Sequence, residues 1–231
     1  EIGDIKFKGF TGRYRPAQPG AVIGADGATL SGTFGARVTD NTDGKKVLLS
    51  CNHVLAEFDA LPVGTEILQP STGFGGASPD DVIGTLKRAV PMDFSPLGVN
   101  YVDAAIAKTN RKAVKTRPFC SAVKPGRQGA VGMLFAASSI MTIINPSDSI
   151  ATLMNVTFPK TATAAIGMSI HACCAISGYV STTISDVMVD LLLVAPNDND
   201  VWFMDQVICA GGVADGFAGD SGAMFYTTYN V

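Results

Sequence analysis

Short apolar runs alternate with turn-forming residues along the whole chain. Valine, isoleucine, threonine and phenylalanine dominate the runs, and these residues favour β-strands. Residues 33–56 predict a hairpin with Asp43 and Gly44 in its turn. The spacing of the runs is typical of antiparallel domains, so the pattern predicts an all-β protein. The other runs that predict strands cover residues 65–70, 80–90, 102–108, 129–139, 139–145, 166–185, 187–195, 201–211 and 222–231.

Two stretches differ from this pattern. Residues 145–158 predict a short helix, because Pro146 is followed by Ser147 and Asp148, which are typical of a helix start. Residues 109–129 are the most basic stretch and contain two prolines, which favours a solvated connector. The connector divides the chain into domains at 1–115 and 116–231. A protein-binding surface is the alternative interpretation of this basic stretch.

Composition limits the size of the core and the kind of partner. The chain has 231 residues, of which 47% are hydrophobic and 16% charged, enough for one large β unit or two packed domains. The net charge is −3 and no basic stripe occurs, so nucleic acid is not expected as a partner. No run of 18 apolar residues occurs, so no membrane span is expected. The oligomeric state stays open.

The five cysteines are Cys51, Cys120, Cys173, Cys174 and Cys209. Their odd number and the adjacent pair among them do not indicate a disulfide framework, so we expect buried free thiols. Free thiols, and an N-terminus without the pattern of a signal peptide, favour the cytoplasm. With two histidines and no CxxC motif, no metal site and no cofactor are expected.

Three polar residues occur in an order that suits nucleophilic catalysis. His53 follows an apolar strand, Asp103 lies inside a short apolar run, and Ser221 lies in the run GDSGA. A serine nucleophile needs a base on its hydroxyl and a carboxylate that fixes the tautomer of that base. Glycine in this loop allows the N–H groups of Gly219 and Ser221 to point at one developing oxyanion. Each signal is weak alone, but together they predict a catalytic triad.

On the motifs NHVLA, ILQP, VDAAIAK and GDSGAM, the chain resembles the chymotrypsin/trypsin clan of serine proteases, in particular a bacterial-type branch. The resemblance implies two packed six-stranded antiparallel β-barrels (chymotrypsin-like), one or two short helices, and a triad in the cleft between the barrels. It implies that His53 is the base, Asp103 the orienting acid and Ser221 the nucleophile, with Gly219 and Ser221 as the oxyanion hole. The implied reaction is endopeptidase cleavage of a polypeptide substrate through an acyl-enzyme.

One segment departs from the order of that branch, where a stretch like residues 130–159 follows the serine strand. Here this stretch precedes Ser221, so we expect a transposed segment in the second barrel, with a coincidental insertion as the alternative. Residues 131–136 are expected to pair with the strand after Ser221, because a closed barrel leaves no edge strand. The segment is expected to line one side of the substrate pocket, through Phe135, Ala136, Ala137 and Ser138.

Other residues near the serine allow more than one interpretation. Asp215 has the spacing of the acid at the pocket base in trypsin-like enzymes that cut after lysine or arginine, and a surface-loop aspartate is the alternative. Asp220 is expected to accept backbone hydrogen bonds, and His171 to be structural. Two other functions also stay open: an inert trypsin-like module for binding or assembly, and an esterase on the same scaffold.

Overall fold

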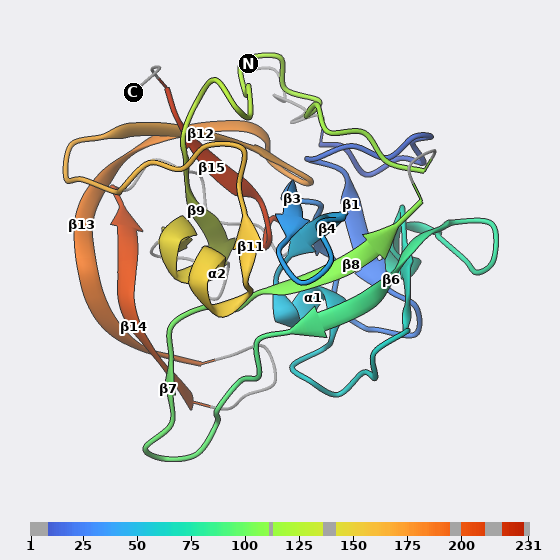
Figure 1. Cartoon of the computed structure of the whole chain (residues 1–231), viewed down its shortest axis with the longest axis horizontal. Coiled ribbons are helices and arrows are strands. Elements are labelled where there is room, and N and C mark those ends of the chain that lie inside the picture. The colour runs from blue at the N-terminus through green and yellow to red at the C-terminus, as the bar shows by residue number, and fades with distance from the viewer. Residues whose placement is uncertain (1–8, 111–112, 136–141, 195–199, 211–218, 229–231) are drawn as a thin grey trace, which may run out of the picture.

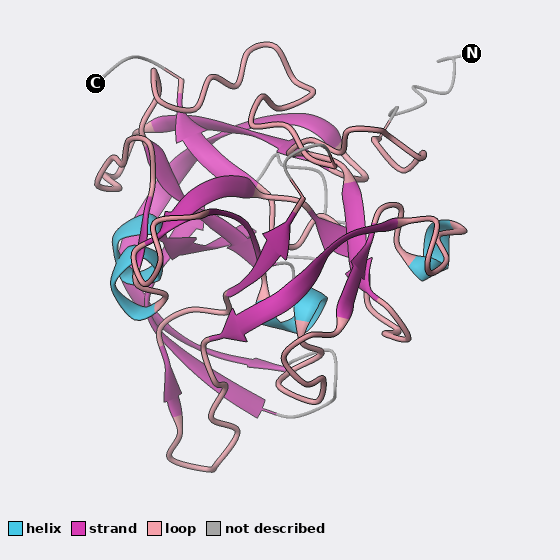
Figure 2. Cartoon of the chain, turned by 45° about the vertical axis from the view of Figure 1, so that its right-hand side comes forward, coloured by secondary structure: helices cyan, strands magenta, loops and turns pink. Residues whose placement is uncertain are grey.

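Strands dominate the computed structural model of the chain, which describes residues 9–110, 113–135, 142–194, 200–210 and 219–228. They form two sheets that lie side by side, with little helix around them (Figures 1 and 2). The described helices are α1 (Asn52–Leu55), α2 (Ser147–Leu153) and the 3₁₀ helix η1 (Thr72–Phe74). The predicted all-β class with short helices is therefore confirmed. Among the described residues, no helix has the length and apolar character to cross a membrane.

The first sheet closes into a barrel. Its strand order is β11-β3-β4-β8-β6-β5-β1-β2, and only two residues separate β2 from β3. The N–H of Phe34 donates to Ala21 O (2.9 Å), next to β1, and the N–H of Gly35 donates to Leu49 O (3.1 Å) in β4. Residues 32–40 therefore connect β1 to β4, and this connection closes the barrel. The strands are β1 (Val22–Ala25), β2 (Gly32–Thr33), β3 (Ala36–Asp40), β4 (Lys46–Ser50), β5 (Glu66–Leu68), β6 (Val82–Ala89), β8 (Ala105–Thr109) and β11 (Val156–Thr157).

The second sheet also closes, because β10 pairs with both β9 and β14. The ring of described strands is β10-β9-β15-β12-β13-β14, and every pair in it is antiparallel. With the first barrel, this confirms the predicted pair of six-stranded antiparallel barrels. The strands are β7 (Val99–Asn100), β9 (Ala130–Phe135), β10 (Thr142–Pro146), β12 (Ser169–Cys174), β13 (Gly178–Val194), β14 (Asp200–Cys209) and β15 (Met224–Thr227).

The strand after Ser221 has the neighbour that the sequence predicted. β15 pairs with β9 through Met224–Met133, Phe225–Gly132 and Tyr226–Ala130, so the predicted pairing is confirmed at Gly132 and Met133 of the stretch 131–136. Ala136 lies outside the described residues. β15 also pairs with β12, so it lies between β9 and β12 in the ring of the second barrel.

Each barrel also carries a short strand from the other half of the sequence. β11 pairs with β3 at the edge of the first sheet, and β7 pairs in parallel with β14 in the second. Between β10 and β11, helix α2 begins at Ser147, inside the stretch 145–158 where a helix was predicted. The division of the chain at residues 115 and 116 stays a prediction, and these exchanged strands tie the two halves together.

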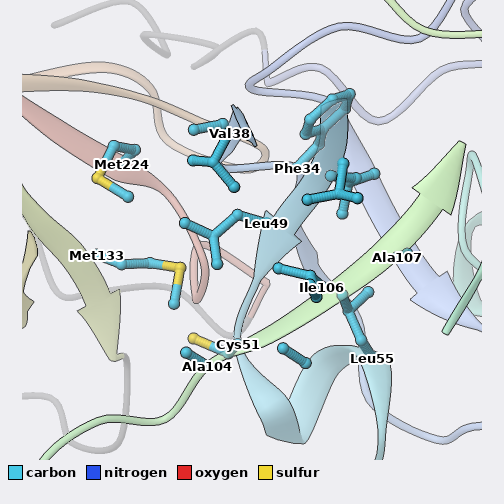
Figure 3. Close-up of a cluster of buried hydrophobic side chains, with 14 of the residues drawn as sticks. Phe34, Val38, Leu49, Cys51, Leu55, Ala104, Ile106, Ala107, Met133 and Met224 are labelled. Carbon is cyan, nitrogen blue, oxygen red and sulfur yellow. The ribbon is translucent and has the colours of Figure 1, made fainter. Parts of the chain in front are cut away.

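A shared apolar core joins the barrels. Met133 and Met224, from the second barrel, lie beside Leu49 and Cys51 of the first (Figure 3). Side chains alternate along β15, so Met224 faces this shared cluster while Phe225 fills the interior of the second barrel. Burial of one such side chain stabilises the fold by about 1.5–3 kcal/mol. The residues just before β15 are therefore held close to the first barrel.

The expectation that all cysteines are free thiols is wrong. Cys120 and Cys173 form a disulfide, whereas Cys51, Cys174 and Cys209 are free and buried. Cys173 and Cys174 differ because successive side chains of a strand point to opposite faces. The Cys174 side chain therefore lies in the interior of the second barrel. Disulfides persist mainly in oxidising compartments, so the cysteines no longer favour the cytoplasm.

An ion cluster on the first barrel predicts a loss of stability in acid. Asp40 is fully buried and binds the Arg88 guanidinium through two hydrogen bonds of 2.8 and 2.9 Å, and it also pairs with Lys87. Burial opposes ionisation, but the hydrogen bonds from Arg88 and Lys87 hold the pKa of Asp40 well below its ordinary 3.8. A lowered folded-state pKa stabilises the fold above about pH 4, and this contribution is lost as the pH falls further.

We expect Asp40→Asn to lower the free energy of unfolding by about 3 kcal/mol at pH 7, because two cations lose their buried partner. The difference between wild type and variant should shrink as the pH falls from 5 to 2. Urea unfolding at each pH measures it, with the exposed Asp26→Asn as the control. A difference that stays constant across this range would contradict the role given to the Asp40 carboxylate.

Candidate active site

A buried histidine and a buried aspartate form the centre of the site. β4 ends at Ser50, and the single turn of α1 then places His53 against the first barrel, where its side chain is 4% exposed. Asp103 lies just before β8 and is fully buried. Its Oδ1 accepts the backbone N–H of His53 (3.1 Å), and its Oδ2 is hydrogen-bonded to Nδ1 of the same residue. One carboxylate therefore fixes both the helix and the imidazole.

The loop around Ser221 lies against the helix of His53. The Ser221 carbonyl accepts the N–H of Thr33 (2.7 Å), and the N–H of Gly222 donates to Leu134 O (2.9 Å). A Cβ added to Gly32 would meet Val54 of α1 at 2.3 Å and the Ser221 carbonyl at 2.7 Å. Gly32 thus lies between the two segments, and its missing side chain permits their close approach. The sequence predicts a triad of His53, Asp103 and Ser221 at this place, and the triad stays a prediction.

Glycine is required on both sides of Ser221. Gly219 and Gly222 have φ angles of 108° and 92°, which L side chains rarely adopt. A Cβ at Gly222 would also lie 2.2 Å from Ser50 Oγ, so a side chain there would push the loop away from β4. Asp220 accepts the backbone N–H groups of Ile176 (2.8 Å) and Ser177 (3.1 Å), as expected of an acceptor of backbone hydrogen bonds.

Three proteases of known structure are similar to this chain. The protease NAPase of Nocardiopsis is 14% identical, with 92% of this chain and 81% of that chain covered and a TM-score of 0.49. Protease A of Thermobifida fusca is 14% identical, with 92% and 79% covered and a TM-score of 0.47. A glutamic acid-specific serine protease that uses a histidine triad in substrate binding is 14% identical, with 91% and 92% covered and a TM-score of 0.45.

No family model and no curated protein match the sequence. The sequence identities and TM-scores to these three structures are low.

Two buried amides hold Asp103 from the second barrel. Oδ1 of Asn145, in β10, accepts the backbone N–H of Asp103 (2.5 Å), and Nδ2 of Asn145 donates to Oε1 of Gln206 in β14 (2.8 Å). Gln206 in turn donates to the carbonyl of Tyr101 (2.9 Å). Both amides are at most 1% exposed. Sequence reasoning missed them, although an amide inside each of two apolar runs was a usable signal.

Cys51 places a neutral thiol beside the pair. Its Sγ donates to Leu134 O (3.4 Å), and its sulfur lies within 4.8 Å of ligand atoms of His53 and Asp103. Burial, followed by the charge of Asp103, raises the pKa of the thiol well above its ordinary value. Metal binding by cysteine needs a thiolate, whereas burial favours the protonated form of this thiol, and the Asp103 carboxylate is already bound to Nδ1 and to the backbone N–H of His53. The three donors therefore suit a metal poorly.

Most of the predicted substrate pocket is not described. Phe135 is buried at the end of β9 and meets the His53 ring edge-on, with centroids 5.6 Å apart. Asp215, Ala136, Ala137 and Ser138 lie outside the described residues. The pocket therefore stays a prediction. His171 lies on β12, where its Nδ1 is 3.0 Å from the Tyr179 hydroxyl and burial lowers its pKa.

Proposed function

We propose that the protein is a serine endopeptidase with the triad Ser221, His53 and Asp103. The observation that carries the proposal is the buried aspartate that binds both the backbone and Nδ1 of one histidine, next to the loop of the serine. An aspartate in this place holds the imidazole in one tautomer and leaves Nε2 to accept a proton. A purely structural histidine does not require a buried charge of this kind.

The proposed reaction has two halves. Oγ of Ser221 attacks the peptide carbonyl while Nε2 of His53 takes the hydroxyl proton, and Asp103 stabilises the imidazolium that forms. The tetrahedral intermediate then breaks its C–N bond, and the amine leaves with the proton from His53. Water repeats the sequence on the ester: it attacks the acyl carbon, His53 takes its proton, and Ser221 leaves as the alcohol.

The remaining parts of the site belong to the same proposal. The N–H groups of Gly219 and Ser221 are assigned to the oxyanion, a role that the positive φ of Gly219 supports. Residues 135–138 and Asp215 are assigned to the substrate pocket, and a polypeptide is the substrate. Segment 130–159 is assigned as a transposed part of the second barrel, a reading supported by the pairing of β9 with β15.

A fluorophosphonate probe tests the function directly. The activated Ser221 oxygen should displace fluoride from phosphorus, so mass spectrometry should find the adduct on the peptide that contains Ser221. The matched control is Ser169→Ala, which removes an exposed serine on β12 and should leave labelling unchanged. A folded protein that stays unlabelled would refute the nucleophile. Labelling with cleavage of esters but not of a peptide library would instead support the esterase.

A further inference from the structure

The turn that follows the helix of His53 has an unusual backbone. Glu57, Phe58 and Asp59 have φ angles of 48°, 56° and 68°, all in the left-handed region. For residues other than glycine this conformation costs about 1–2 kcal/mol each. Three successive residues in this conformation persist only where the surrounding structure holds them, and strained residues of this kind are found mostly at functional sites.

Side chains hold this turn at both ends. The carboxylate of Glu57 accepts the backbone N–H and the hydroxyl of Thr29, at 2.9 and 2.8 Å. The Asp59 carboxylate accepts a hydrogen bond from Nδ2 of Asn52 (2.6 Å), and the backbone N–H of Asp59 donates to Oδ1 of Asn52 (3.2 Å). Its second oxygen accepts the N–H of Met92 (2.7 Å). Asn52 is fully buried and directly precedes His53, so the turn is tied to the helix that carries the imidazole.

The result of this turn is a ring on the face of His53. The Phe58 ring lies nearly parallel to the imidazole, with centroids 5.5 Å apart and an interplanar angle of 23°. Phe94 packs edge-on against Phe58 at 5.7 Å. If α1 continued as a right-handed helix, residue 58 would lie about 140° around its axis from His53 and could not reach the ring. The left-handed turn instead directs the Phe58 side chain toward the imidazole of His53.

We infer that Phe58 is a positioning residue for the imidazole of His53, and that Asn52 and Asp59 clamp the turn that presents it. The inference rests on the proposed function. Asp103 restrains Nδ1 and Phe135 packs nearly perpendicular to the imidazole ring, while Phe58 is stacked on it. Without that cover the imidazole gains freedom to tilt and water gains access to it. Loss of orientation costs turnover rather than substrate affinity.

The test compares Phe58→Ala with Phe58→Tyr, which keeps a ring, and with Phe74→Ala, which removes an exposed aromatic from η1. We expect Phe58→Ala to lower kcat and the rate of phosphonylation by a small fluorophosphonate about 10- to 100-fold, with KM changed less than threefold. Phe58→Tyr and Phe74→Ala should stay near wild type. A rise in KM alone, with phosphonylation unchanged, would overturn the inference and make Phe58 a substrate contact.

An NMR readout separates this inference from the proposed function. In wild type the Nδ1–H proton of His53, bound to Asp103, should exchange slowly with water. In Phe58→Ala we expect exchange about tenfold faster or more, because the ring opens to solvent. Equal exchange rates would overturn the inference even if the protein is an active protease. Failure of labelling and cleavage in wild type would overturn the function, while the exchange rates would still decide whether Phe58 holds the imidazole.

Discussion

Ser221→Ala should reduce peptide hydrolysis about a millionfold, the loss expected when the nucleophile of a serine triad is removed. Only one oxygen is lost, and Ser221 is 3% exposed in a loop that Gly219 and Gly222 shape through their backbone. The fold should therefore survive. Single-turnover cleavage of a peptide measures the loss, and thermal unfolding checks the fold. Activity within a few-fold of wild type would end the assignment of Ser221.

Asp103→Asn should lower kcat about 10⁴-fold while the site keeps its shape. The asparagine oxygen can still accept the N–H of His53, but the amide nitrogen then faces Nδ1 as a donor. Nδ1 must become an acceptor, so the proton moves to Nε2, which then cannot take one from Ser221. Steady-state kinetics with a peptide substrate measure the loss.

The matched control for this substitution is Asp81→Asn. Asp81 is also a largely buried carboxylate, but it lies just before β6 and its partners are Arg13 and Arg15 rather than a histidine. We expect this control to affect stability and to leave kcat near wild type. A loss of less than tenfold in Asp103→Asn would contradict the role of Asp103 as the group that sets the tautomer.

The alternation of apolar and polar residues was enough to predict the all-β class, because strand patterns are local, whereas the two barrels were implied by the resemblance to the protease clan. The pairing of β9 with β15 was predictable for a different reason: a barrel that ended at the strand after Ser221 would have left an open edge. Strand limits were harder. Residues 178–194 form one strand, although Asp186 had suggested a break, because register shifts on both sides of Asp186 and a positive φ at Met188 let β13 bend without ending.

The parts of the site that escaped prediction depend on contacts across the two barrels. Asn145 and Gln206 are distant in sequence from Asp103, and only the packing of β10 and β14 brings them to it. The disulfide between Cys120 and Cys173 likewise joins the connector to β12. The turn at Phe58 has no local signal, since none of its three residues is glycine and the side chains of Glu57 and Asp59 bind partners outside the turn.

The place of β15 has a consequence for the newly made chain. β15 is synthesised after every other strand of its ring, yet it lies between β9 and β12. While the ribosome extends the chain, these two strands keep an unpaired edge each, and the second barrel stays open until residues 224–227 emerge. Ser221 arrives immediately before that strand. Under the proposed function, nascent chains therefore lack proteolytic activity until the barrel closes, and closure and activation are one event.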